Sequence, residues 1–211
     1  MTTSEYRCQF AIWALMKAPL LISTDVTNMS AATLEILSNT DVIAINQDAL
    51  GVAGRLVEER PPDAAHLQVW AGPLSAGRVA VVLWNRGETM QEILGRFVNM
   101  QLEGSARVYD CLAHEDLGIA SGQLVRNVSA HDVAVFVLTP TTGEHEDVGR
   151  RGDGGRQQGV AGGSRAWTAA HDAAWAARWR GHGVAYPQSR LAWEAEKQAG
   201  SKIYRRRANR R

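Results

Sequence analysis

Cysteine is scarce in this sequence, and several other marks of specialised proteins are missing. The 211 residues include two cysteines, Cys8 and Cys111, too few and too far apart to form a disulfide framework or a metal-binding set. No run of about eighteen apolar residues predicts a membrane span, and no basic and then apolar leader after Met1 predicts a signal peptide. We therefore expect a globular chain without membrane partner, metal or cofactor, and nothing predicts its compartment or oligomeric state.

Charge is distributed unevenly along the chain. Residues 1–140 hold 9 Lys/Arg and 15 Asp/Glu, whereas residues 141–211 hold 14 and 7. Residues 141–163 are rich in glycine, arginine and acids with almost nothing to bury, which predicts a disordered linker. The Arg-rich end could contact nucleic acid, but without a fold around it we favour a solvated tail and expect no nucleic-acid partner.

Within this tail, one short stretch has helical spacing. Ser164 could cap a helix in which aromatic side chains recur four residues apart, at Trp167, His171, Trp175 and Trp179. Arg, Gly, Ala and Trp are also what GC-rich DNA encodes in an unselected reading frame. We therefore interpret residues 141–211 as a linker and tail, with a short helix, rather than as a domain.

The first 51 residues alternate between helical and extended patterns. Thr3 or Ser4 can cap a helix that runs to about Lys17, and Ser30 can cap a second helix to about residue 39. Between them, residues 18–25 form an apolar run that predicts a strand buried on both faces, as in a parallel sheet. Residues 41–51 predict another extended segment, which ends in a glycine turn.

From residue 67 the pattern changes to repeated short strands. Gly, Pro and Asp turn signals separate runs rich in Val, Leu, Ile and aromatics, which is typical of an antiparallel sandwich. Arg78 to Asn85 is nearly continuously apolar and predicts a central strand. The six expected strands cover residues 67–71, 78–85, 89–98, 106–111, 123–128 and 133–139.

Long sequence blocks occur at residues 4–7, 10–21, 29–30, 41–51, 69–74, 81–86 and 131–134. In sequence and in order, these blocks closely resemble the family-27 glycoside hydrolases, the α-galactosidases or melibiases. The resemblance covers roughly residues 2–140 and no residue after Pro140. It implies the last helix-strand-helix of a (β/α)8 barrel in residues 1–51 and the Greek-key β-sandwich of this family in residues 52–140.

The resemblance also implies a reaction that this chain alone lacks the residues to perform. The family cleaves terminal α-galactosyl groups with retention, which requires two carboxyl groups about 5 Å apart. Both family aspartates, and the galactose-binding residues, belong to strands and loops that precede the first residue of this sequence. We therefore predict no catalytic or substrate-binding residue here, and a chain that is inactive alone. Family members are usually secreted, vacuolar or lysosomal.

Some local candidates remain, each with a plainer interpretation. Asp25 follows a predicted barrel strand, where active sites of this fold gather, but a turn-forming role is favoured. The polar triplet at residues 46–48 could line a pocket, although we favour a structural role at the domain junction. His131 and Asp132 resemble a base and its orienting carboxylate, but we interpret them as turn residues.

Two tryptophans and two glycosylation sequons complete the candidates. Trp70 and Trp84 could stack on a sugar, which would favour a non-catalytic module that binds carbohydrate or protein; at alternating strand positions we expect core residues instead. Asn28 and Asn127 begin sequons that matter only if the chain is secreted. Ser30, the third residue of the Asn28 sequon, is expected to cap a helix, and this role explains the serine without a glycan on Asn28.

Overall fold

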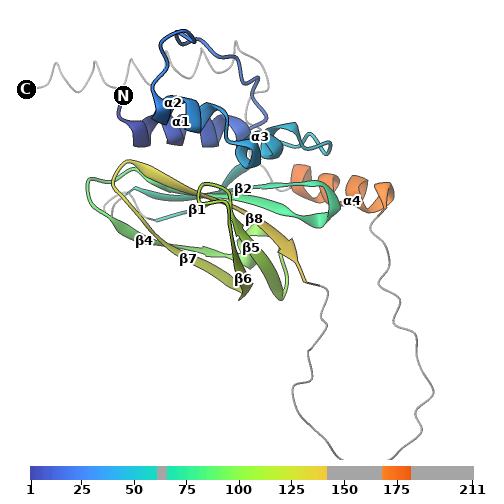
Figure 1. The fold of residues 1–211 in the computed structure, drawn as a ribbon. Helices are drawn as coiled ribbons and strands as arrows, with labels where there is room; N and C mark the ends of the chain where they lie inside the picture. Colours follow the sequence, from blue (N-terminus) through green and yellow to red (C-terminus); the bar gives the residue numbers. More distant parts are fainter. Residues whose placement is uncertain (61–65, 142–167, 182–211) are drawn as a thin grey trace, which may run out of the picture. The chain divides into compact units, whose positions relative to one another are not determined.

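A computed structural model describes residues 1–60, 66–141 and 168–181, and residues 1–179 cluster as one unit. Three helices come first, followed by strands and short 3-10 turns, with a last helix at the end of the described chain (Figure 1). The helices are α1 (Thr3–Leu15), α2 (Ala31–Leu37), α3 (Thr40–Gln47) and α4 (Ala169–Gly181), and the 3-10 turns are η1 (Ser75–Gly77) and η2 (Phe97–Met100). The strands are β1 (Arg55–Glu59), β2 (Leu67–Pro73), β3 (Val79–Asn85), β4 (Gln91–Arg96), β5 (Ser105–Asp110), β6 (Glu115–Ser121), β7 (Gln123–Val128) and β8 (Asp132–Pro140).

The strands form the predicted antiparallel sandwich. Six of them make one sheet in the order β1-β2-β3-β8-β5-β6, and β4 pairs with β7 in a second sheet. The neighbours β3–β8 and β8–β5 are not consecutive in the chain, so β8 enters the sheet by a crossover between them. Apolar side chains from both sheets fill the space between them, including Val81, Ile93 and Phe136.

The continuous apolar run at residues 79–85 is explained by two cores. Successive side chains of a strand point to opposite faces. Val79, Val81 and Leu83 contribute to the core between the sheets, whereas Ala80 and Val82 contribute to a second core beneath the helices. β3 is therefore buried on both faces, which confirms the prediction of a central strand.

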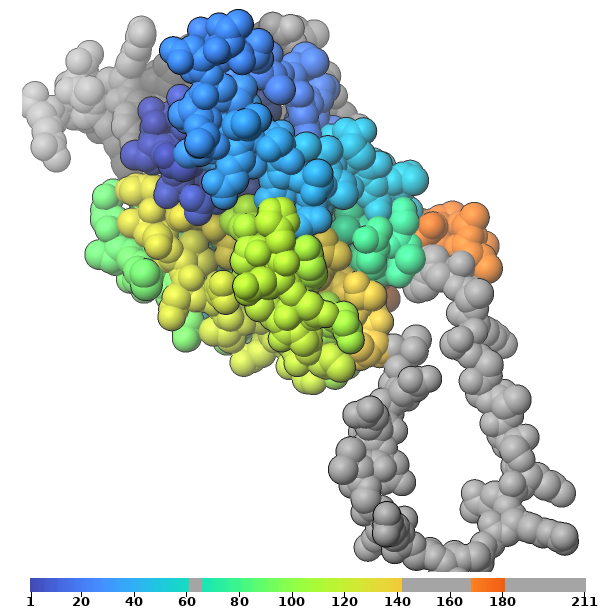
Figure 2. Space-filling model, in the orientation of Figure 1, coloured from blue at the N-terminus to red at the C-terminus, as the bar shows by residue number. Residues whose placement is uncertain are grey.

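Helices α1 and α3 cover the outer face of the six-stranded sheet (Figures 1 and 2). Leu15 packs closely there: a Cβ added to Gly54 would lie 2.5 Å from Leu15 Cγ, and one added to Gly72 would lie 2.7 Å from Gly54 Cα. Helix α1 can therefore pack close to the sheet because Gly54 and Gly72, which lie beneath Leu15, have no side chains. The cap of α1 is Thr2, which forms a capping box with Glu5, so the predicted caps at Thr3 or Ser4 were wrong by one or two residues.

The predicted strand at residues 18–25 is not formed. Residues 18–25 have no regular secondary structure between α1 and α2, and they pair with no strand in the part of the chain that the structure describes. Leu21 is 79% exposed and Ile22 56% exposed. A parallel strand needs neighbouring strands for its backbone hydrogen bonds, and the described residues supply none. Residues 1–51 therefore consist of α1, an unpaired segment, α2 and α3.

The extended structure predicted for residues 41–51 is also wrong, because most of this segment is helix α3. Asn39 begins the helix by accepting hydrogen bonds from the backbone N–H groups of Asp41 and Val42. Val42 and Ile45 lie three residues apart and are both buried beneath the helix. A short run rich in β-branched residues fits either a strand or a buried helix, and the Asn39 cap distinguishes the two.

Three further elements differ from the expectation. Strands β1 and β6 were not predicted; β6 is exposed at nearly every position, including its two alternating apolar residues, Leu117 and Ile119. The short helix of the tail is present as α4, but Trp175 and Trp179 are buried against the core between the sheets rather than solvated. The rest of the tail lies outside the described residues. This includes Trp167, the predicted disordered linker and the basic end.

Candidate functional site

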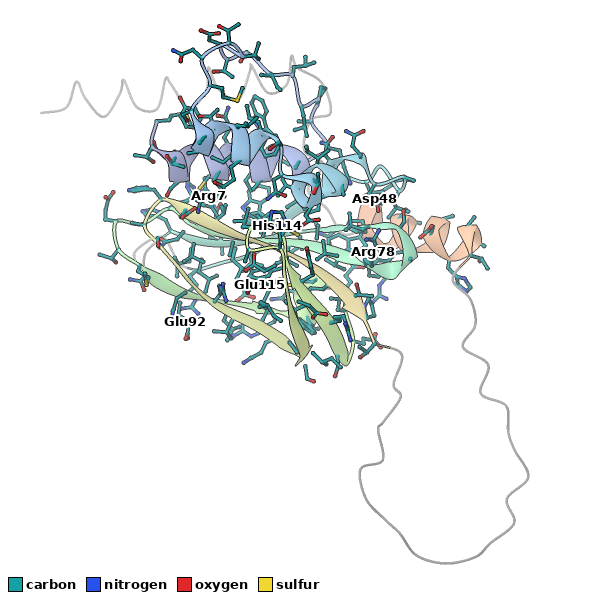
Figure 3. All side chains as sticks on the ribbon, viewed as in Figure 1. Arg7, Asp48, Arg78, Glu92, His114 and Glu115 are labelled. Carbon is teal, nitrogen blue, oxygen red and sulfur yellow. The ribbon has the colours of Figure 1, made fainter. Side chains whose placement is uncertain are left out.

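The polar side chains predicted as candidates gather where the helices meet the sandwich. Asp48 follows the last residue of α3, and its side chain is 5% exposed. One carboxylate oxygen accepts hydrogen bonds from the Leu50 N–H at 3.0 Å and from the N–H and hydroxyl of Ser75 at 2.9 Å each. The other oxygen lies 3.0 Å from the Arg78 guanidinium (Figure 3). Asp48 thus joins α3 to the turn between β2 and β3.

The electrostatics of Asp48 favour its charged form. Burial alone would raise the pKa of this carboxyl group, but hydrogen bonds from Ser75 and Leu50 outweigh it, and the pKa lies below its ordinary value. Asn46 instead ties α3 to the segment after α1, because its amide donates to the Ala18 carbonyl oxygen at 2.9 Å. The amide of Gln47 donates to the Asn46 side chain. Within the triplet, Asp48 therefore has the structural role at the junction that was predicted, whereas Asn46 and Gln47 bond within residues 1–51.

Asp132 makes a second connection between the helices and the sandwich. Its two carboxylate oxygens accept from the Arg7 guanidinium at 3.3 and 3.0 Å, and one also accepts from the Ser4 hydroxyl at 3.3 Å. The neighbouring His131 ring points elsewhere, to Glu88 at 3.1 Å. Because Asp132 and the His131 ring bind different partners, they are not arranged as a base and its orienting carboxylate.

Cys8 is the candidate nucleophile that lies next to His131, and it is poorly suited to that role. Its thiol donates to the backbone carbonyl of His131 at 3.3 Å, not to the imidazole ring. Burial raises the pKa of the Cys8 thiol to about 12, so the reactive thiolate is not populated near neutral pH. The contact is another structural link between α1 and the turn before β8.

A third connection, centred on Asp41, was not anticipated from the sequence. Asp41 Oδ2 lies 2.6 Å from His114 Nδ1 and accepts from the Tyr109 hydroxyl at 3.1 Å. Asn39 donates its side-chain amide to the Cys111 carbonyl oxygen at 2.9 Å. The signal that could have revealed both residues is the helix start itself, an Asn cap with an acid in the first turn.

The remaining candidates occupy positions that explain them without a ligand. Asp25 is exposed and accepts from the N–H and hydroxyl of Thr27 at 2.9 and 2.7 Å, as a turn former does. Trp70 is buried, and its indole N–H donates to Gln68 at 3.0 Å. Trp84 packs at the edge of the core beneath the helices. Neither tryptophan forms an exposed platform for a sugar ring.

Two of the hollows beside the helices have the same volume. One, of about 350 Å³, lies between α3 and β5 and has Asp41, Arg107 and Tyr109 in its lining. The other, also about 350 Å³, lies between α1, residues 20–24 and α2 and is mainly apolar. Within the described ranges, no group of three or more His, Cys, Asp and Glu side chains could hold a metal ion. No helix found there is long and apolar enough to span a membrane.

Comparisons with known proteins divide the chain at the same junction. A family model described as "Alpha galactosidase A" matches residues 1–48, and one described as "Alpha galactosidase C-terminal beta sandwich domain" matches residues 64–138. The first match ends at the anchoring carboxylate, and the second covers most of the sandwich. The division agrees with the two kinds of structure seen on either side of Asp48.

Individual relatives are similar over the same region. Alpha-galactosidase 3 of Arabidopsis thaliana is 49% identical over 151 residues, which cover 70% of this chain and 34% of that protein. The alpha-galactosidase of Coffea arabica is 49% identical over 142 residues, which cover 66% and 36%. The crystal structure of alpha-galactosidase I from Mortierella vinacea superposes with a TM-score of 0.62 at 28% identity, covering 67% of this chain and 36% of that one.

The chain thus spans about a third of the length of the curated relatives it matches. The matches run from the first helix to the end of the sandwich, and the folds agree over that range. The chain belongs to the family-27 glycoside hydrolases and corresponds to the C-terminal part of an α-galactosidase.

Proposed function

We propose that this chain supplies the C-terminal part of an enzyme that hydrolyses terminal α-galactosyl groups with retention, and that it contributes architecture rather than catalysis. The relatives are named α-galactosidases, which supports the substrate class. Within the chain, residues 1–51 are the end of the barrel domain and residues 52–140 the sandwich domain. The interface between them is held by Arg7, Asp41, Asp48 and Asp132.

This proposal rests on the partners of the buried carboxylates, which bind structural groups rather than each other. Retaining hydrolysis needs a nucleophilic carboxylate and a nearby acid whose pKa is raised. Asp48 and Asp132 instead face backbone N–H groups and arginines across the junction. Hydrogen bonds from the Thr2 backbone and the Thr27 hydroxyl lower the pKa of Glu5 and Asp25, opposite to the shift of a general acid.

The alternative is a sandwich module that binds carbohydrate or protein without catalysis. It requires an exposed aromatic platform, and Trp70 is 6% exposed with its N–H occupied by Gln68. Binding that disappears in Trp70→Ala or Trp84→Ala variants would still support it. Because Trp70 is in the core beneath the helices and Trp84 packs against that core, we favour the α-galactosidase part.

An activity assay tests the proposal. The purified chain is incubated with a chromogenic α-galactoside beside the Coffea arabica enzyme at equal concentration. We expect hydrolysis by the coffee enzyme and none by this chain, because two correctly spaced carboxyl groups are required. Turnover that co-purifies with the chain and persists through a second chromatography step would contradict the proposal.

A further inference from the structure

One of the two glycosylation sequons lies on an exposed strand of the sandwich. Asn127, Val128 and Ser129 span the end of β7, which pairs only with β4 among the described strands. Leu124 and Val128 are buried in the core between the sheets, so the alternating residues Val125 and Asn127 face outward. This outer face lies on the side of the sandwich away from α1 and α3 (Figure 1). A glycan on Asn127 would therefore meet neither the core nor these helices.

The backbone of this sequon is anchored, whereas its polar side chains are not. The side-chain amide of Asn85, a buried residue, donates to the Val128 carbonyl oxygen at 2.9 Å. The side chains of Asn127 and Ser129 are exposed, and no hydrogen bond within the described ranges engages them. In the other sequon, the Ser30 hydroxyl is engaged as the cap of α2. Of these two sequons, the one at Asn127 thus presents both side chains to solvent without a competing contact.

The surface around Asn127 is one that a glycan would protect. Asn127 lies opposite Glu92 in the ladder (Glu92 is labelled in Figure 3), and Val125, 40% exposed, lies opposite the half-buried Leu94. Side chains directly opposite each other on one face are close enough to interact, so Leu94 and Val125 form an apolar patch beside Asn127. As far as the chain is described, each strand of this two-stranded sheet also has one edge without a ladder partner. Such an edge is a template for association with another chain, and a bulky, hydrated group at Asn127 would hinder that association.

We propose that Asn127 accepts an N-linked glycan when the chain is synthesised into the secretory pathway, and that this glycan shields the outer face of the β4–β7 sheet. The co-reactant is an oligosaccharide carried on a lipid pyrophosphate, and the transferase of the host cell catalyses the step. The Asn127 side-chain nitrogen loses one proton to the medium and bonds to C1 of the first sugar. The C1–O bond to the pyrophosphate breaks, and the lipid pyrophosphate leaves. Ser129 supplies the hydroxyl that the sequon requires.

The experiment produces the full chain in yeast behind a secretion signal and measures glycan occupancy by peptide mass spectrometry. Both total cell protein and the medium are analysed, so poor export does not hide the result. We expect a glycan on the peptide that contains Asn127. Asn127→Gln and Ser129→Ala should abolish it, whereas Ser129→Thr, which retains the hydroxyl, should keep it. Asn28→Gln is the matched control and should leave the occupancy of Asn127 unchanged.

An unoccupied Asn127 peptide, in cells whose own secreted proteins are glycosylated, would overturn the proposal. Occupancy that survives Ser129→Ala would overturn the role of the sequon. The shielding is tested with an endoglycosidase that leaves only the first sugar, because this trims the folded protein without adding a charge. We expect trimming to raise the light scattering of a concentrated sample, since the apolar patch and the strand edge become accessible. Unchanged scattering would overturn the shielding.

Discussion

Replacing Asp48 with alanine is expected to destabilise the chain by about 3–4 kcal/mol. Three hydrogen bonds to one carboxylate oxygen, from Leu50 and Ser75, are each worth roughly 1 kcal/mol. Arg78 is 38% exposed, so solvent screening limits its ion pair to about 0.5 kcal/mol. For a protein of this size the loss corresponds to a fall in melting temperature of roughly 10 °C.

Urea denaturation followed by circular dichroism measures this effect. Glu92→Ala is the matched control, because Glu92 is exposed on β4, and it should change stability by less than about 0.5 kcal/mol. The pKa of Asp48 is lower when folded than when unfolded, so its contribution is present above the unfolded value of about 3.9 and is lost as the pH falls through the folded value. Equal stability of Asp48→Ala and Glu92→Ala at pH 7 would refute the anchoring role.

Three more perturbations probe other parts of the fold. Gly72→Ala places a Cβ 2.7 Å from Gly54 Cα and should cost about 1–3 kcal/mol in urea denaturation; an unchanged midpoint would contradict the close contact under α1. Trp179→Ala should cost about 3 kcal/mol, since the ring is buried in the inter-sheet core, and a neutral effect would show that α4 is not part of that core. Cys8 and Cys111, whose pKa values burial raises to about 12, should resist thiol reagents at pH 8 until the chain unfolds, and fast labelling of the native protein would argue against their burial.

The sandwich could be predicted from the sequence because a central strand that is buried on both faces is apolar at nearly every position. Residues 79–85 are apolar throughout, and both faces of β3 are buried. The edge strand β6 could not be predicted, because residues 115–121 are almost entirely exposed and are held by backbone pairing with β5. Its two alternating apolar residues, Leu117 and Ile119, are too few to predict a strand by themselves.

Elsewhere the sequence was ambiguous because the decisive contacts are distant. Residues 18–25 carry the composition of a buried strand, but a strand forms only if neighbours are present. Trp175 and Trp179 looked like part of a tail, and their burial depends on a surface formed more than thirty residues earlier. The roles of Asp48 and Asp25 could be judged from position alone, whereas that of Asp41 depended on recognising the start of α3.

The central claim, that this chain is the non-catalytic part of an α-galactosidase, is tested most directly by covalent trapping. A mechanism-based inactivator that forms a glycosyl ester with the nucleophile of retaining enzymes is incubated with the chain, and intact mass is measured. We expect an unchanged mass for this chain and a stoichiometric increase for the Coffea arabica enzyme. A glycosyl adduct on Asp25, Asp48 or any other carboxylate of this chain would contradict it.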